Sequence, residues 1–163
     1  MQIVCDTGPI LHLIEINALD LLDVAGGVCI PPVVERELLS LIPDWPNRKP
    51  EWITIVDLDE EHLADVSIWQ TSGLLHAGEA ESIALARQVH SIWYLTDDTA
   101  SRVFGISQGL EVHGTLGVVL WAAANRHIDR PHAETLLRRL RESTLWISVK
   151  VFAEAWSALD RLY

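Results

Sequence analysis

The stretch QIVCDTGPILHLI, residues 2–14, decides the fold class of this chain. Its first part, up to Cys5, is a short apolar run of the kind found in buried strands. Asp6 ends the run, a Gly-Pro pair interrupts it, and apolar residues then recur at helical spacing from Ile10 onward. A strand followed directly by a helix is the unit from which parallel sheets are built.

The same order recurs along the rest of the chain. Strands are predicted at residues 28–30, 52–56, 91–95 and 110–112, with a further candidate at 145–148. Helices are predicted at residues 33–42, 60–69, 79–89, 100–108, 115–125, 131–142 and 150–161, and the proline-rich stretch 43–50 is expected to be a loop. We therefore predict one three-layer α/β/α domain over residues 1–163, with a central parallel sheet of four to five strands.

Composition excludes several classes of protein. With 49% hydrophobic and 21% charged residues, the 163-residue chain is not of the disordered type. No apolar run approaches the roughly 20 residues that span a bilayer, and the first residues do not resemble a secretion signal. Cys5 and Cys29 lie in apolar runs and are expected to be buried free thiols, so we expect a cytoplasmic protein that makes no membrane contact.

The negative charge is concentrated in one part of the chain. The net charge is −11, but residues 1–100 carry a balance of −13 and residues 101–163 a balance of +2. A net charge of this sign argues against a simple electrostatic nucleic-acid binder. The asymmetry indicates instead that some of the acids form a cluster.

Three acids follow predicted strands, where ligands bind in open parallel sheets. Asp6 comes after the first strand, and Asp97 and Asp98 come after the strand at 91–95. An aspartate between a strand and a helix is also a common N-cap. Two strand ends that both finish in aspartate favour a site.

Three further acids lie on predicted helices. Glu37 lies near the edge of the buried face of its helix, and Glu79 and Glu81 open the next long helix but one. Acids in a first helical turn are also favoured by the helix dipole alone. At a separation of about 5 Å, two carboxylates repel each other by roughly 3 kcal/mol at an effective dielectric near 20. A cluster of such groups therefore needs cations, and an all-oxygen set suits Mg²⁺ or Mn²⁺.

Five segments in this order resemble the PIN-domain family of metal-dependent ribonucleases, and within it the group related to the VapC toxins of toxin–antitoxin pairs. They are VCDTGPI at 4–10, IPPVV at 30–34 with Glu37, GEAESIALA at 78–86, LTDD at 95–98 with Arg102, and VHGTLGVVL at 112–120. The resemblance covers residues 2–126 well and the C-terminal helices loosely.

The resemblance implies an acidic active site that hydrolyses RNA phosphodiester bonds. It implies Asp6, Glu37, Glu81 and Asp98 as catalytic acids that bind one or two Mg²⁺ or Mn²⁺ ions, with Glu79 and Asp97 as neighbouring ligands that could replace them. It also implies that Thr7 orients a carboxylate or a water, and that Arg102 meets a phosphate or an acid of the cluster. The partners it implies are RNA, a protein antitoxin and a second copy of the chain.

The sequence also allows other interpretations of the function. The alternative is a non-catalytic PIN-fold interaction module whose acids are caps and surface charge, and the low number of basic residues favours it. A metal phosphatase is the least favoured of the three interpretations. Among seven tryptophans, Trp45 in the proline-rich stretch is the expected exposed aromatic contact, whereas Trp69 and Trp156 could face a partner subunit.

Overall fold

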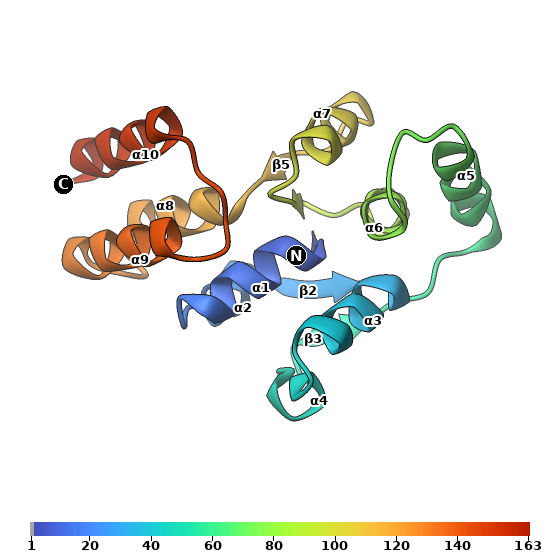
Figure 1. Ribbon diagram of the computed structural model, residues 1–163, viewed down its shortest axis with the longest axis horizontal. Coiled ribbons are helices and arrows are strands. Elements are labelled where there is room, and N and C mark those ends of the chain that lie inside the picture. Colours follow the sequence, from blue (N-terminus) through green and yellow to red (C-terminus); the bar gives the residue numbers. More distant parts are fainter. Residues whose placement is uncertain (1) are drawn as a thin grey trace.

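The computed structural model describes residues 2–163 and confirms the α/β fold with a parallel sheet (Figure 1). The five strands are β1 (Gln2–Cys5), β2 (Gly27–Ile30), β3 (Ile53–Ile55), β4 (Trp93–Leu95) and β5 (Val112–His113). All neighbouring pairs are parallel, and the order across the sheet is β3-β2-β1-β4-β5. The chain therefore builds one half of the sheet outward from β1 and then crosses to the other side of β1 for β4.

Helices connect the strands and cover both faces of the sheet. They are α1 (Thr7–Glu15), α2 (Leu21–Ala25), α3 (Pro32–Leu41), α4 (Trp45–Arg48), α5 (Glu60–Thr71), α6 (Ala77–Gln88), α7 (Thr99–Ser107), α8 (Thr115–Ala124), α9 (Arg130–Glu142) and α10 (Val149–Leu162). None of them, in the part of the chain that the structure describes, combines the length and apolar character needed to cross a bilayer.

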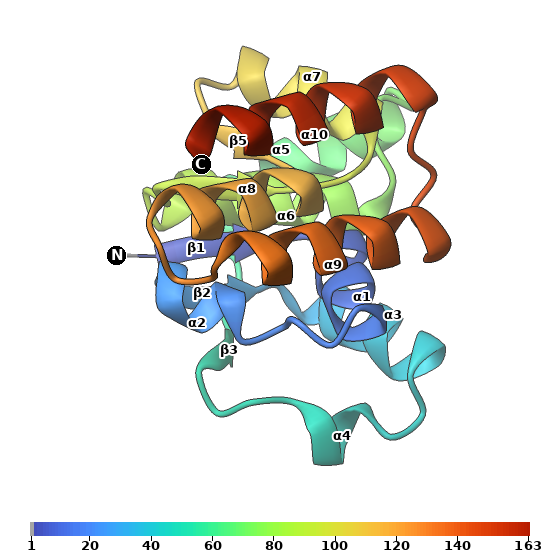
Figure 2. The same cartoon turned by 90° about the vertical axis from the view of Figure 1, so that its left-hand side faces the viewer.

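The alternation of side chains along the strands produces two hydrophobic cores, one on each face of the sheet. Ile3 and Cys5 of β1 belong to the larger core, which is covered by α1, α2, α3, α8, α9 and α10. Val4 of the same strand belongs to the smaller core under α5 and α6. Figure 2 shows α8, α9 and α10 gathered on one side of the sheet.

Several local predictions are wrong. Residues 45–48 form a short helix rather than a loop, and Trp45 is fully buried because its indole N–H donates to Glu35 at 2.8 Å and its ring joins the larger core. Residues 145–148 form no strand, since they connect α9 and α10, both packed on α8, away from the edges of the sheet. Trp69, expected as a contact for a partner subunit, is also buried and packs edge-on against Phe104.

The crossover from one half of the sheet to the other places a crevice between β1 and β4. In open parallel sheets, ligands bind at such a switch point, outside the carboxyl ends of the strands. Asp6 directly follows β1, and its backbone N–H donates to the carbonyl of Leu95, the last residue of β4, at 2.9 Å. The two predicted acidic strand ends are therefore neighbours.

Candidate active site

A pocket of about 400 Å³ opens at the carboxyl ends of β1 and β4. It is lined by six of the eight predicted site residues: Asp6, Thr7, Glu37, Glu79, Asp97 and Asp98. The other two, Glu81 and Arg102, are not among the residues that line it. Neither lysine nor arginine lines the pocket, so its carboxylates are not neutralised by a permanent cation.

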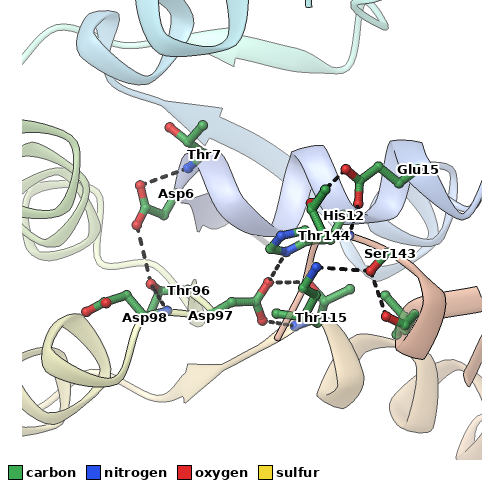
Figure 3. A network of polar contacts seen from close by, with 12 residues as sticks. Asp6, Thr7, His12, Glu15, Thr96, Asp97, Asp98, Thr115, Ser143 and Thr144 are labelled. Carbon is green, nitrogen blue, oxygen red and sulfur yellow. Dashed lines mark hydrogen bonds and ion pairs between the residues drawn. The ribbon is translucent and has the colours of Figure 1, made fainter. Parts of the chain in front are cut away.

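Asp6 lies deepest among the pocket's acids and is only 8% exposed. Its Oδ1 accepts a hydrogen bond from the Thr7 backbone N–H at 2.8 Å, and its Oδ2 accepts one from the Thr96 hydroxyl at 3.3 Å (Figure 3). The pKa of Asp6 is raised from 3.8 to about 7, mainly by burial and also by the charges of Glu37 and Glu79, against the hydrogen bonds from Thr7 and Thr96. A raised pKa is expected for a buried carboxylate such as Asp6 that has no positively charged partner.

Glu37 reaches the pocket from α3, on the other side of β1 from Asp98. The Thr7 hydroxyl donates to Glu37 Oε2, which fixes the direction of the carboxylate. Gly78, the second residue of α6, provides the necessary space, because a Cβ there would lie 2.7 Å from Glu37 Oε1. A glycine at this position therefore lets α6 pass close to the Glu37 carboxylate.

Glu79 and Asp98 each combine a helix-capping role with a place in the pocket wall. Glu79 Oε2 accepts the His76 backbone N–H at 3.0 Å at the start of α6. Asp98 is the N-cap of α7, and its Oδ1 accepts the Ser101 backbone N–H at 2.7 Å. A capping role and a role in the site are therefore compatible for these acids. Each capping hydrogen bond uses only one oxygen of the carboxylate.

Asp97 accepts more hydrogen bonds than any other acid of the pocket. Its Oδ1 accepts the Thr115 N–H at 2.8 Å, and its Oδ2 accepts the Thr115 hydroxyl at 2.5 Å and His12 Nδ1 at 2.7 Å (Figure 3). Burial on its own would raise the pKa of Asp97, but the hydrogen bonds from His12 and Thr115 outweigh it and lower the pKa. Asp97 thus links the end of β4 to the last turn of α1 and to the start of α8.

Glu81 and Arg102 have other contacts. Burial and, more weakly, the charge of Glu37 raise the pKa of Glu81, while Arg36 and a hydrogen bond from the Val33 backbone N–H act in the opposite direction, so this carboxylate lies against the start of α3. Arg102 donates to the backbone carbonyls of Thr96 at 3.2 Å and Val112 at 3.4 Å. It connects the ends of β4 and β5 and points to neither the pocket nor an acid within salt-bridge distance.

The pocket's carboxylates fit a hard divalent cation in chemistry, although no preformed cage exists. Within residues 2–163, no group of three or more histidine, cysteine, aspartate or glutamate side chains is close enough to hold a metal directly. Across the same residues, Asp6, Glu37, Glu79 and Asp98 form no ion pair. Four unpaired carboxylates in one pocket suit Mg²⁺, which keeps several waters and uses few direct protein ligands.

Two of the pocket residues that were not predicted as site residues are His12 and Trp146. His12, in the last turn of α1, lines the pocket beside Asp97, and Trp146 lies in the segment between α9 and α10. The sequence signal for Trp146 is the alternation Leu145-Trp146-Ile147, in which the outer two residues pack against the larger core. Such alternation predicts that Trp146 points away from the core.

The parallel sheet and the acids at the carboxyl ends of β1 and β4 define an α/β domain with an acidic crevice. A family model described as a PIN domain matches residues 2–161, so the chain belongs to the PIN-domain family. PIN domains are in general nucleases, and divalent metals are their typical cofactors. No curated protein and no solved structure matches the chain at a significant level.

Proposed function

We propose that this PIN-domain chain is an endoribonuclease that depends on Mg²⁺ or Mn²⁺ and hydrolyses RNA phosphodiester bonds. The observation that carries the proposal is the pocket at the β1–β4 crevice, where Asp6, Glu37, Glu79 and Asp98 gather without a cationic partner. Such a cluster destabilises the protein unless a bound cation compensates it. A fold keeps an arrangement of this kind for binding or catalysis rather than for stability.

A bound divalent ion supplies an activated water and charge stabilisation for phosphodiester hydrolysis. The protein residues hold the ligand oxygens in place. Thr7 orients two acids of the pocket, because its backbone N–H donates to Asp6 and its hydroxyl donates to Glu37. The contacts of Asp97 with His12 and Thr115 fix the chain immediately before Asp98, which supports Asp98 as the fourth carboxylate of the proposed site.

The third acid of the proposed site is Glu79 rather than Glu81. Glu79 lines the pocket, and its charge raises the pKa of Asp6, whereas Glu81 faces Arg36 and the start of α3. The two residues differ by two positions on one helix, about 200° around its axis. A matched pair of variants, Glu79→Gln and Glu81→Gln, therefore separates the two assignments.

The test is cleavage of a single-stranded RNA with Mn²⁺, with excess EDTA as the metal-free control. We expect wild-type cleavage to stop in EDTA and in Asp6→Asn, to fall by about 100-fold or more in Glu79→Gln, and to change little in Glu81→Gln. Full activity of Asp6→Asn in a clean preparation would contradict the site. A folded wild type that binds no Mn²⁺ would leave the non-catalytic interaction module as the account of this chain.

We also propose that the chain is the cytoplasmic toxin of a toxin–antitoxin pair. A toxic nuclease needs a protein inhibitor, and α5 offers an exposed apolar surface through Leu63, Ile68 and, just after the helix, Leu74. This surface is a candidate for a second copy of the chain or for an antitoxin segment. Sedimentation of wild type and Ile68→Ser tests the homodimer, since loss of a dimer in the variant would place the interface on α5.

A further inference from the structure

Trp146 is the most exposed large hydrophobic residue in the part of the chain that the structure describes, at 84%. It lies between α9 and α10 and lines the same pocket as the carboxylates. An indole ring of this exposure leaves a large apolar surface in water. A ligand that covers the ring in the functional complex would remove this surface from water.

The segment that carries Trp146 is held on both sides of it. The Thr144 N–H and hydroxyl donate to the Glu15 carboxylate at 3.1 and 2.7 Å, which ties the segment to the end of α1 (Figure 3). Leu145 and Ile147 pack against the larger core. The backbone of Trp146 is therefore anchored, and mainly the two side-chain torsions of its indole remain free.

The surroundings of the ring favour a flat, polar-edged partner. The other pocket residues are carboxylates, threonines, histidines and glycines, with Leu145 as the one other apolar side chain. A nucleobase presents an apolar face to stack on the indole and a polar edge to such a wall. The part of the chain after residue 100 also carries the positive balance of +2, including Arg138, Arg141 and Lys150 in α9 and α10.

A protein partner would use a different set of contacts. Val149 is 78% exposed and only three residues from Trp146, yet it does not line the pocket. An apolar protein surface would cover both side chains, whereas a base at the pocket mouth would cover the indole alone. Val149 is therefore the matched control for the role of Trp146.

We infer that Trp146 stacks on one unpaired base of the RNA substrate at the mouth of the carboxylate pocket. This inference rests on the proposed nuclease function and adds a specificity-determining residue to it. In a duplex the bases already stack on one another and their faces are not available to the indole. The bound base places the adjoining phosphodiester at the pocket that Trp146 shares with the carboxylates.

The first test compares cleavage of a short unstructured RNA by wild type and by three variants. Loss of one stacked base weakens binding by about 5- to 100-fold, so Trp146→Ala should raise KM by that factor and change kcat much less. Trp146→Phe should restore most of the affinity, and Val149→Ser should match wild type. A perfectly paired duplex of the same sequence should be a poor substrate for all four proteins.

The second test measures binding alone, by fluorescence anisotropy of a labelled phosphorothioate strand in Mn²⁺. One base at a time is replaced by an abasic unit. We expect one abasic position to weaken binding to wild type as much as Trp146→Ala does, and to have no further effect in that variant. Such non-additivity is the signature of a direct contact between the two groups.

The outcomes separate this inference from the proposed function. If wild type cleaves RNA and Trp146→Ala has the same KM and the same affinity, the stacking is refuted and the nuclease function stands. A change of oligomeric state in both Trp146→Ala and Val149→Ser, with RNA affinity unchanged, also refutes it in favour of a protein interface. If wild type cleaves no RNA, the nuclease proposal fails, and the binding test still decides: stacking stands if only Trp146→Ala loses affinity, and falls if wild type binds no strand.

Discussion

Asp6 combines deep burial with two negative neighbours, and its carboxylate therefore makes the stability of the metal-free protein depend on pH. The pKa in the folded state is about 7, above the ordinary value of 3.8. A raised folded pKa means that the contribution of this group is most favourable below pH 4 and is lost as pH rises toward 7. At 1.4 kcal/mol for each pKa unit, the difference between the folded and the ordinary pKa of Asp6 lowers the free energy of unfolding by roughly 4 kcal/mol at pH 8.

Asp6→Asn should therefore stabilise the metal-free protein at high pH while it abolishes cleavage. Thermal unfolding in EDTA is expected to show the variant several degrees above wild type at pH 8, and close to wild type at pH 4.5. The reason is that asparagine cannot ionise and keeps the hydrogen-bonding shape of the protonated acid. A variant that is less stable than wild type at both pH values would contradict the raised pKa of Asp6.

Gly78→Ala tests the close passage of α6 over Glu37. The new Cβ would meet the end of a flexible side chain, so Glu37 should move while the fold remains. We expect Mn²⁺ affinity to fall by about 10- to 100-fold, as for other changes that misdirect a ligand, with a free energy of unfolding within about 1 kcal/mol of wild type. Calorimetry and urea unfolding measure the two quantities.

Gly117→Ala in α8 is the matched control for that variant. A Cβ at Gly117 would meet His113 at ordinary contact distances of 3.5 Å or more. This change should leave Mn²⁺ affinity unchanged, because the residue does not line the pocket. Equal losses of affinity in the two alanine variants would remove the argument that Gly78 makes room for Glu37.

At the scale of elements, Asp97 joins β4, α1 and α8 through hydrogen bonds to a charged acceptor. Thr115 is fully buried, and Thr115→Val keeps its shape while it removes the hydroxyl that donates to Asp97. The loss should cost about 1–3 kcal/mol of unfolding free energy at pH 7. Because the pKa of Asp97 is lowered in the folded state, this contribution should shrink as pH falls below 4.

Urea unfolding at pH 7 and in acid measures this effect, with Thr135→Val as the control. Thr135 is exposed on α9, and its hydroxyl donates only to the Pro131 carbonyl within its own helix. The control should stay within about 0.5 kcal/mol of wild type at both pH values. An equal loss in both variants would mean that the Asp97 network does not join these elements energetically.

The elements also show how far the sequence could predict this molecule. The strand–helix alternation predicted the parallel sheet, and the acids after two strands correctly indicated which ends meet. The choice between Glu79 and Glu81 depends on the rotation of α6 about its axis, which only packing decides. The prediction that Trp45 is exposed is wrong because it rests on the proline content of its segment. The buried indole donates a hydrogen bond to Glu35, which lies on a helix whose orientation the sequence does not specify.

At the scale of the whole molecule, both cysteines report on the opening of the sheet. Cys5 of β1 and Cys29 of β2 are free and buried, and burial raises the pKa of the Cys5 thiol, with Asp6 adding to the rise. We expect a thiol reagent to label them only when the sheet opens. Mn²⁺ at 100 times its Kd should slow labelling by about 100-fold, because binding stabilises the native state by about 2.7 kcal/mol.

Asp6→Asn is the control for the labelling experiment. Mn²⁺ should give this variant little protection, although its labelling without metal should be slow at pH 8. The same slowing by Mn²⁺ in both proteins would show that the ion acts outside the pocket. Rapid labelling of the folded wild type would contradict the burial of the strands themselves.

The most direct test of the central claim is calorimetric titration of Mn²⁺ into wild type, Asp6→Asn and Glu111→Gln. Glu111 is an exposed acid that does not line the pocket, so its variant controls for general charge. We predict saturable binding to wild type and to Glu111→Gln, and none to Asp6→Asn. Absence of binding to a folded wild type, or equal binding to all three proteins, would contradict the account of a metal-binding carboxylate pocket.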